Sequence, residues 1–539
     1  MTPRARRALF TVVLFFAVCA VVGSVLQRRV GAQTVTDESQ LRDSLKSFTD
    51  VYSLVEKNYA EPINGDKADI AIYDGAIPGM LRVLDPHSNF YDPKAYARLR
   101  EDQRGHYYGV GMVIQQQLNK VLVITPYEGT PSFRAGIHPG DVISAVDGKA
   151  TDGWTSDQVA KALKGPKGTH VQVTTVRVGT AAPLVFDLVR DEIPHPSVDL
   201  KYEIRPGVGY IHLTQFQETT GDEMTEAING FGDLKGLVID LRNNPGGLLS
   251  QAVDVCDHLL TKGQGIVSQR GRAYPDQNYT ANHGNGGKTF PIVVLVNRGT
   301  ASAAEIVSGA LQDHDRALIV GETTFGKGLV QTVYNLSENT GLALTTYHYY
   351  TPSGRLIQRD YSHSSMIEYY TARPKSDAPA TTDDVKATDS GRKVYGGGGI
   401  TPDEKYAAPR ANKFQRHVLS YSTDPRSQDA FYHFAESYFG SRKPVLDPAW
   451  NPDADTMNRF KEFLHTNQVT FTEDEFAANK DWVRDRIRYE FLFRADGKKA
   501  ANQAARQTDT EVLAAIDDMP KAESLMKESN KAYAMRAAK

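Results

Sequence analysis

Cysteine is scarce in this sequence: Cys19 and Cys256 are the only two among 539 residues. Two cysteines so far apart exclude a disulfide framework and a thiolate zinc site. No His-x3-His pair and no Walker-type or dinucleotide loop is found in the core, so neither a metal nor any other cofactor is expected. An excess of either charge is also lacking, because 62 Lys and Arg residues face 65 Asp and Glu residues. A formal charge of -3 provides no basic field for nucleic acid.

Length and composition indicate several globular domains. At roughly 150 residues per domain, the chain has room for about three or four units. Apolar residues make up 40% and charged residues 24% of the sequence, which is enough to build ordinary cores. A single small binding module is therefore excluded.

Only one long apolar run is present, from Ala8 to Leu26, and it follows Arg4, Arg6 and Arg7. A basic flank before a run of this length favours an uncleaved single-pass membrane anchor within residues 1–33. A cleaved signal peptide ending near Val30–Ala32 is the alternative, which gives a periplasmic or secreted form. In both cases we expect the bulk of the chain to lie outside the cytoplasm, on the periplasmic side.

The next two segments differ in their apolar spacing. Residues 34–104 are predicted to be helical, because Leu41, Leu45 and Phe48 recur at steps of three and four. Residues 105–191 instead contain short β-branched runs broken by glycines, such as Lys120–Ile124 and Val171–Val176. This pattern predicts a small β-rich domain.

Residues 192–408 alternate short apolar strands with helical stretches. The strands are predicted at Leu237–Leu241, Ile292–Val296 and Leu318–Val320, and the helices at Leu248–Leu260 and Ala303–Gln312. Such alternation is typical of α/β units, so the fold class is α/β within an α+β multidomain chain.

Two polar segments and a long extension complete the chain. Gly271–Lys288 is rich in Gly and Asn, and Arg373–Gly399 mixes Pro, Ser, Thr and Asp with four consecutive glycines. Both are predicted to be mobile surface loops. Residues 409–539 are polar and helix-prone, with Trp482, Ile487 and Phe491 as apolar anchors, and predict a helical appendage without an assigned role.

The candidate nucleophile is Ser302 in the sequence GTASAAE, which directly follows an apolar strand. A serine at a helix N-terminus faces backbone N–H groups that favour negative charge. The same serine, with Glu305 three residues later, also fits a capping box, which is the more frequent use of this pattern.

The candidate base is Lys327, which lies between glycines in GETTFGKGLVQ. If the lysine is buried, its neutral amine can accept the serine proton, and Ser-Lys pairs are a known variant of the serine nucleophile. A solvated loop lysine is the alternative. The turn Arg242–Gly247 is a third feature, because its glycines let backbone N–H groups approach a reacting carbonyl, although a simple tight turn has the same sequence.

Together these stretches resemble the C-terminal processing peptidases, also called tail-specific proteases, which are serine peptidases with a crotonase-like core and an inserted PDZ domain. The resemblance covers about residues 41–403. The stretches that carry it are Leu84–Phe90, Gly207–Ile211, Arg242–Gly247, Gly299–Ile306, Gly321–Gln331, Thr351–Arg355 and Gly399–Asp403.

This resemblance implies Ser302 as nucleophile, Lys327 as general base and Gln331 as the residue that orients the lysine. The oxyanion hole is implied at the N–H groups of Ala303 and of Gly246 or Gly247. The four-residue spacing from Lys327 to Gln331 lets the two meet if the chain turns helically or across a short bend. Outer serines common in the family are replaced here by Thr300 and Ala304, which leaves Ser302 as the clearer choice.

The β-rich segment fits the inserted PDZ domain. Its carboxylate-binding loop is assigned to Tyr108, Gly109, Val110 and Gly111, whose N–H groups would take the terminal carboxylate of a peptide. The strand that follows would then add the peptide at its edge. Protein or peptide substrates with free C-termini are therefore the expected partners, while a homo-oligomer or an adaptor protein is left open.

The function expected from sequence is a serine endopeptidase that recognises C-terminal tails and cleaves with a Ser-Lys dyad. One alternative is a catalytically inactive, membrane-anchored PDZ scaffold that holds partner C-termini. Another keeps hydrolysis but uses a histidine as base, for which the core offers His212, His258 and His314 together with Asp240.

Overall fold

The computed structural model describes residues 39–63, 66–117, 119–177, 179–362, 365–371, 384–406, 409–420, 429–440 and 444–537. The chain divides into two compact units, Met1–Val83 and Leu84–Lys539. The membrane anchor predicted within residues 1–33 lies outside the described residues. Among those described, no helix is both long enough and apolar enough to cross a membrane.

The described part of the first unit is helical. Residues 39–58 form one helix, and α2 (Asp66–Ile70), a π-helix (Ala71–Ala76) and α3 (Ile77–Arg82) follow. The helical prediction for residues 34–104 is confirmed for most of its length, but β1 (Asn89–Tyr91) interrupts it in the second unit before α4 (Pro93–Arg104).

The centre of the second unit is a mixed sheet of six strands in the order β10-β11-β12-β15-β16-β21. The strands are β10 (Val198–Arg205), β11 (Val208–Leu213), β12 (Gly236–Asp240), β15 (Ile292–Val296), β16 (Leu318–Gly321) and β21 (Glu404–Lys405). All neighbouring pairs are parallel except β10 with β11. Every residue of β12 and β15 is buried, which is typical of parallel strands covered on both faces.

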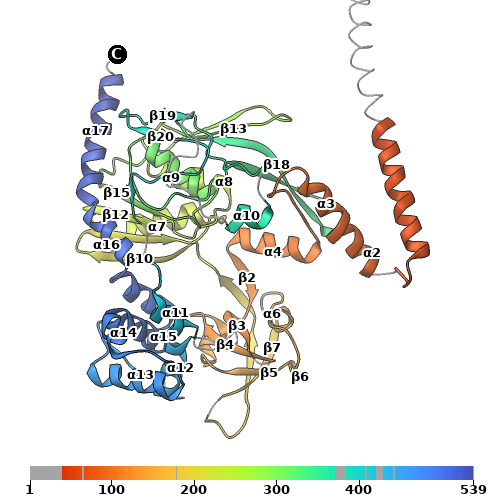
Figure 1. Cartoon of the computed structure of the whole chain (residues 1–539), viewed down its shortest axis with the longest axis vertical. Coiled ribbons are helices and arrows are strands. Elements are labelled where there is room, and N and C mark those ends of the chain that lie inside the picture. Colours follow the sequence, from red (N-terminus) through yellow and green to blue (C-terminus); the bar gives the residue numbers. More distant parts are fainter. Residues whose placement is uncertain are drawn as a thin grey trace, which may run out of the picture. The chain divides into compact units, whose positions relative to one another are not determined.

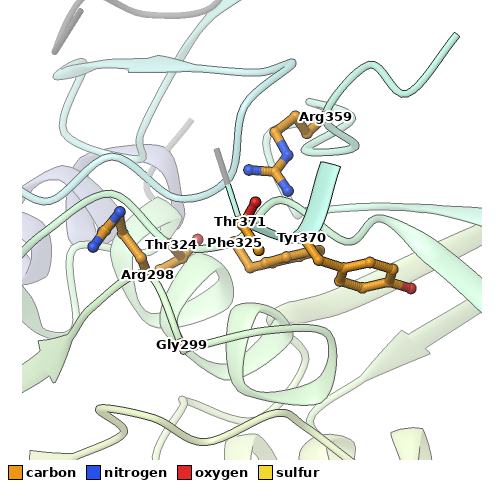
Figure 2. Close-up of a pocket in the computed structure, with 7 residues that line it drawn as sticks. All are labelled: Arg298, Gly299, Thr324, Phe325, Arg359, Tyr370 and Thr371. Atoms are coloured by element: carbon orange, nitrogen blue, oxygen red, sulfur yellow. The ribbon is translucent and has the colours of Figure 1, made fainter. Parts of the chain in front are cut away.

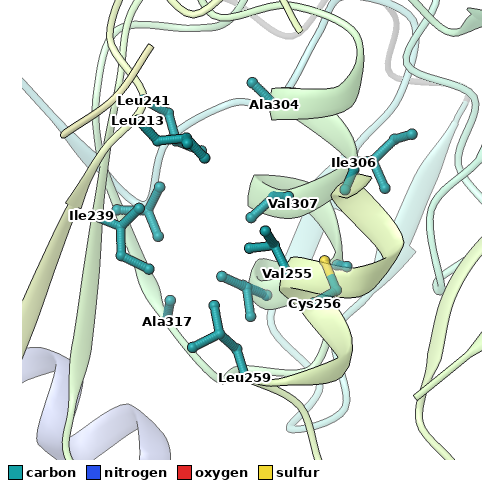
Figure 3. Close-up of a cluster of buried hydrophobic side chains, with 14 of the residues drawn as sticks. Leu213, Ile239, Leu241, Val255, Cys256, Leu259, Ala304, Ile306, Val307 and Ala317 are labelled. Atoms are coloured by element: carbon teal, nitrogen blue, oxygen red, sulfur yellow. The ribbon is translucent and has the colours of Figure 1, made fainter. Parts of the chain in front are cut away.

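One face of this central sheet packs against α7 (Thr220–Gly230), α8 (Leu249–Asp257) and α9 (Ala303–Asp313). Alternate strand residues such as Ile239 and Leu241 meet Val255, Cys256 and Val307 of the helices (Figure 3). Cys256 is fully buried in this apolar cluster.

The opposite face of the sheet is covered by the end of the chain. Helices α16 (Thr510–Asp517) and α17 (Met519–Ala537) run beside β12 and β15 (Figure 1). Their buried residues Val512 and Ala515 pack against Val238 and Val293, which point away from α8 and α9. The extension is thus more than a separate appendage, because its last two helices form one layer of the core around the central sheet.

Further strands of the second unit form a second sheet and one small pair. The second sheet has the order β1-β18-β13-β14, with β17 also paired to β18. Besides β1, its strands are β13 (Gly265–Arg270), β14 (Gln277–Thr280), β17 (Leu329–Asn335) and β18 (Gly341–Tyr350). The separate pair consists of β19 (Val385–Ala387) and β20 (Lys393–Tyr395). A 3-10 turn at Ser337–Asn339 and the helix α10 (Met366–Thr371) lie between these strands. Strands therefore occur inside both segments that were predicted to be loops.

The β-rich prediction for residues 105–191 is confirmed, because β2 to β9 lie within residues 106–194. The sheet of this segment has the order β3-β4-β5-β7-β8, with β6 paired to β5, and β2 pairs with β9. The elements are β2 (His106–Gly109), β3 (Met112–Gln117), β4 (Lys120–Pro126), α5 (Pro131–Arg134), β5 (Val142–Val146), β6 (Lys149–Ala150), α6 (Ser156–Leu163), β7 (His170–Val176), β8 (Leu184–Val189) and β9 (Asp191–Pro194).

An aromatic helical cluster precedes the two core-covering helices. It contains α11 (Lys413–Leu419), α12 (Ala430–Phe439), α13 (Ala454–Thr466), α14 (Glu473–Ala478) and α15 (Lys480–Arg506). Phe431, Phe460 and Phe491 are its largest buried side chains. Ile487 is also fully buried, as the sequence predicted, and Trp482 packs against the cluster.

Substituting Val512→Ala should lower the thermal midpoint of unfolding. The side chain is fully buried between α16 and the sheet, so losing its methyl groups removes apolar contacts and leaves a void. We expect a loss of about 1–2 kcal/mol, measured by circular dichroism on heating. Val445→Ala is the matched control, since Val445 is 97% exposed. Equal midpoints for the two variants would contradict the packing of α16 on the core.

Candidate active site

Three loops that follow neighbouring parallel strands meet at one edge of the central sheet. The loop after β12 carries Arg242–Gly247, the loop after β15 carries Ser302, and the loop after β16 carries Lys327. Sites in open α/β sheets lie at the carboxyl ends of such strands. The strand order therefore brings together segments that are separated by about eighty residues of sequence.

Hydrogen bonds fix the first two of these loops to each other. The Ala301 N–H donates to the carbonyl oxygen of Asn244 at 2.9 Å, and the Thr300 hydroxyl donates to the Leu241 carbonyl at 2.8 Å. Asn243 and Asn297 exchange two further hydrogen bonds. These hydrogen bonds join the turn after β12 to the loop that carries Ser302.

Ser302 is the N-cap of α9 and has a strained backbone, with φ 55° and ψ -115°. A positive φ is uncommon for a residue with a Cβ, and such strain is often found at functional sites. Ser302 and Glu305 form the capping-box pair that the sequence predicted. The Ser302 N–H donates to the Glu305 carboxylate at 2.8 Å and the Glu305 N–H donates to the Ser302 carbonyl oxygen at 2.8 Å, so this pairing does not exclude a catalytic role for the hydroxyl.

The buried Glu305 carboxylate joins the nucleophile loop to the lysine loop. Its Oε2 accepts the N–H of Ser302 at 2.8 Å and the N–H of Lys327 at 2.9 Å. Its Oε1 accepts the N–H of Gly326 at 2.7 Å and the hydroxyl of Thr324. The backbone nitrogens of Ser302 and Lys327 can therefore be no further apart than the sum of two hydrogen-bond lengths.

Burial at this site favours the neutral forms of both Glu305 and Lys327. Burial raises the pKa of Glu305 to about 7, while hydrogen bonds from Thr324, Lys327, Gly326 and Ser302 act in the opposite direction. Burial lowers the pKa of Lys327 below its usual range, although the negative charges of Glu305 and Asp85 work against that shift. A desolvated lysine of this kind loses its proton more readily than one in water.

The sequence left His87 and Asp85 without a role, although both lie in the quoted stretch Leu84–Phe90. Burial lowers the pKa of His87 to about 4, and the positive charge of Lys327 acts in the same direction. His87 Nε2 lies 3.0 Å from the Tyr369 hydroxyl. The Asp85 side chain accepts hydrogen bonds from the N–H groups of His87 and Ser88, each at 2.7 Å. Aspartate often forms such a local turn, so the sequence Asp85–Ser88 could have indicated it.

Gln331 is linked to Ser88, the residue after His87, through Thr345. Its Nε2 donates to the Thr345 hydroxyl at 3.1 Å, and the Thr345 N–H donates to the Ser88 hydroxyl at 3.1 Å. Because Leu329 already begins β17, the chain between Lys327 and Gln331 does not turn helically. Within the ranges given above, no hydrogen bond joins Gln331 to Lys327, so its orienting role stays a prediction.

The backbone donors in the turn after β12 and at the start of α9 differ in their availability. The Gly246 N–H donates to Asn244 Oδ1 at 2.9 Å and is therefore already used. Gly247 forms a parallel bridge with Phe216. In this bridge the Phe216 N–H donates to the Gly246 carbonyl and the Leu248 N–H donates to the Phe216 carbonyl, so the Gly247 N–H is not used. The N–H groups of Gly247 and Ala303 have no acceptor within the described part of the chain. A Cβ on Gly247 would lie 2.1 Å from the Phe216 carbonyl oxygen, so only glycine fits this approach.

A cavity of about 240 Å³ lies between the loops after β15 and β16. Figure 2 shows its lining side chains, which include two arginines and two aromatic rings. The Arg359 guanidinium lies 4.4 Å from the Phe325 ring centre, and Arg298 lies 3.7 Å from a carboxylate oxygen of Glu322. The lining residues are Arg298, Gly299, Thr324, Phe325, Arg359, Tyr370 and Thr371.

The three core histidines considered from sequence each face a carboxylate. The pairs are His212 with Asp199 at 2.6 Å, His258 with Asp254 at 3.5 Å, and His314 with Asp389 at 2.7 Å. Asp240 accepts hydrogen bonds from Tyr210 and Arg242. Among the described residues, none of these histidines contacts Ser302, so the structure does not bring a Ser-His pair together there.

The predicted PDZ loop lies between β2 and β3. Tyr108 and Gly109 belong to β2, whereas Val110 and Gly111 connect it to β3. The carbonyl groups of Val110 and Gly111 accept hydrogen bonds, but their N–H groups meet no acceptor in the ranges that the structure covers. Since β3 is an edge strand of the PDZ sheet, the loop and the edge are both suited to an added peptide.

Comparison with known proteins identifies two regions. Residues 207–362 match the peptidase family S41, and residues 98–176 match the PDZ domain. The carboxy-terminal-processing protease of Bartonella bacilliformis is 40% identical over 353 residues, which are 64% of this chain and 80% of that protein. The carboxyl-terminal-processing protease of Synechocystis is 40% identical over 292 residues, or 53% of this chain and 68% of the relative. The solved photosystem II D1 C-terminal processing protease aligns at 28% identity over 70% of this chain and 92% of its own, with a TM-score of 0.34.

Substituting Glu305→Gln should destabilise the protein. Each Glu305 oxygen accepts two hydrogen bonds, so an amide nitrogen in either position leaves at least one backbone N–H without an acceptor. Each orphaned donor costs about 1–3 kcal/mol, which should lower the thermal midpoint by several degrees. Glu226→Gln, at an exposed surface ion pair, serves as control. An unchanged midpoint for Glu305→Gln would show that this carboxylate does not join the two loops.

Proposed function

Because this chain belongs to peptidase family S41, we propose that it hydrolyses peptide bonds with Ser302 as nucleophile and Lys327 as general base. The observation that carries this proposal is the shared Glu305 carboxylate, which holds the backbone of both residues. The lowered pKa of Lys327 supports it, since a base must be able to lose its proton near working pH. Membership of the family makes the chain a serine peptidase with a PDZ domain.

In the proposed reaction, the neutral Lys327 amine takes the proton of the Ser302 hydroxyl, and Oγ attacks the carbonyl carbon of the scissile bond. The N–H groups of Gly247 and Ala303 donate to the oxygen that becomes negative. The Lys327 ammonium then protonates the leaving amine, and water hydrolyses the acyl-enzyme to release the new C-terminus. No cofactor takes part in these steps.

Substrate recognition is proposed to use the free end of a protein chain. The N–H groups of Val110 and Gly111 would bind the terminal carboxylate, and the peptide would add to the edge of β3. The PDZ domain would thereby raise the local concentration of the tail near Ser302. The cavity between the loops after β15 and β16 would accept a side chain close to the scissile bond.

We also propose that the part of the chain that follows the apolar run lies outside the cytoplasm. This placement rests on the basic residues before Ala8–Leu26 and on the length of that apolar run.

Both Ser302→Ala and Lys327→Ala should abolish cleavage of an unstructured polypeptide, measured by mass spectrometry of the products. We expect kcat to fall by about a thousandfold or more in each variant. A nucleophile and its base act as a unit, so the loss of either residue removes the function of both. Ser337→Ala and Lys262→Ala are exposed matched controls and should cleave normally. If Lys327→Ala retained activity within about tenfold of the parent, another group such as His87 would be the base.

A peptide with a free C-terminal carboxylate should bind more tightly than its amide. Binding is measured by fluorescence anisotropy with the full chain carrying Ser302→Ala, which prevents turnover. Gly111→Ala should weaken carboxylate binding about tenfold, since its Cβ would lie 2.4 Å from the Thr130 side chain and distort the loop. Gly129→Ala is the control, because Gly129 has a similar φ but open space around its Cβ. Equal affinity of acid and amide would contradict the proposed recognition of chain ends.

A further inference from the structure

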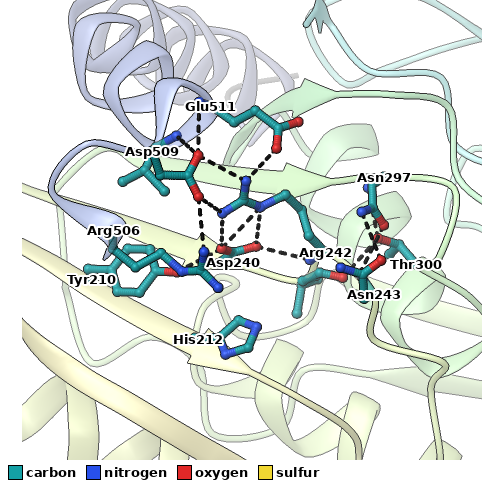
Figure 4. A network of polar contacts seen from close by, with 12 residues as sticks. Tyr210, His212, Asp240, Arg242, Asn243, Asn297, Thr300, Arg506, Asp509 and Glu511 are labelled. Carbon is teal, nitrogen blue, oxygen red and sulfur yellow. Dashed lines mark hydrogen bonds and ion pairs between the residues drawn. The ribbon is translucent and has the colours of Figure 1, made fainter. Parts of the chain in front are cut away.

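Arg242, the residue that opens the turn after β12, binds three carboxylates (Figure 4). Its Nε and Nη2 donate to Asp240 at 2.9 and 2.6 Å. Its Nη2 and Nη1 donate to Asp509 at 2.9 and 3.2 Å, and Nη1 also donates to Glu511. The guanidinium is therefore held from both sides, by β12 and by the end of the chain.

The two distant carboxylates come from the C-terminal extension. Asp509 is the N-cap of α16, and Glu511 lies in the first turn of this helix. Arg506, at the end of α15, donates to Asp509 at 3.0 Å and extends the same network. The apolar face of α16 packs on the central sheet, so the helix can present these carboxylates at a fixed position.

Burial makes this network sensitive to the loss of a partner. Asp240 is fully buried and Arg242 is 7% exposed. Burial by itself raises the pKa of Asp240, but the Arg242 guanidinium outweighs it and lowers the pKa to about 2. A buried guanidinium that loses one carboxylate must move towards another acceptor or towards water. Movement of Arg242 necessarily moves the residues joined to it.

The residues joined to Arg242 are those that shape the proposed oxyanion hole. Asn243 follows with φ 59°, and the Asn244 side chain bonds both the Leu213 carbonyl and the Gly246 N–H. Gly247 then approaches the Phe216 carbonyl so closely that a methyl group would not fit. These hydrogen bonds and the close approach of Gly247 restrict the backbone conformation of the turn between Arg242 and Gly247.

We propose that Asp509 and Glu511 are positioning residues for peptide-bond hydrolysis, which act through Arg242 on the turn that presents the Gly247 N–H. This inference rests on the proposed function, because it assumes that Gly247 donates to the oxyanion. The C-terminal extension then has two roles: its apolar face completes the core, and the acidic start of α16 sets the geometry of the site. Neither carboxylate touches the substrate.

The test compares Asp509→Asn and Glu511→Gln with Val512→Ala in the full chain. Asn at position 509 keeps the side-chain oxygen that caps α16 but loses the charge that faces Arg242. Val512→Ala weakens the packing of the same helix without touching the ion network. Each protein is assayed for kcat and KM with one peptide, and its thermal midpoint is recorded.

Both charge variants should lose kcat by about tenfold or more with KM nearly unchanged, since a displaced oxyanion donor acts in the transition state. Val512→Ala should keep kcat within about twofold of the parent although its midpoint falls. Unchanged kcat in the charge variants would overturn the inference. So would a kcat that falls in all three in proportion to the midpoint, because the role would then be structural. Failure of the proposed function looks different: the parent would cleave no better than Ser302→Ala.

Discussion

The Glu305 carboxylate is the contact on which the arrangement of the site depends. It is fully buried, and its four acceptor positions are taken by the backbone of Ser302, Gly326 and Lys327 and by the Thr324 hydroxyl. A buried carboxylate is stable only when such donors surround it. The same bonds that satisfy Glu305 therefore hold the nucleophile loop and the lysine loop together, while the surrounding burial lowers the pKa of Lys327.

A second constraint reaches the site from the opposite face of the sheet. Helix α16 covers strands β12 and β15, and its first residues bind Arg242 at the start of the turn after β12. The apolar layer and the ion network thus depend on one short helix. The family match covers residues 207–362 and therefore does not include this helix. Helices near the end of the chain thus cover the same sheet whose loops carry the candidate site.

Sequence reasoning predicted the elements whose signal is local. The strand Ile292–Val296 and the helix from Ala303 are found as predicted, because a buried apolar run and a capping box define them without distant partners. Strand β14 was missed, since a polar segment becomes a strand only when β13 supplies its hydrogen bonds. The capping role of Glu305 was predicted, but its bonds to Gly326 and Lys327 depend on the order of the parallel strands. Two of the three carboxylate partners of Arg242, Asp509 and Glu511, lie 267 and 269 residues away, and no local pattern signals them.

The proposed role of a desolvated Lys327 as the base is tested most directly by the pH dependence of kcat/KM, measured with a peptide that does not titrate in the range used. Only the neutral amine accepts a proton, so activity should fall as the pH decreases through the pKa of Lys327. We predict one such limb, with its midpoint below about 10.4, the ordinary value for lysine. A midpoint at the ordinary lysine value, or the same limb in the residual activity of Lys327→Ala, would contradict the claim.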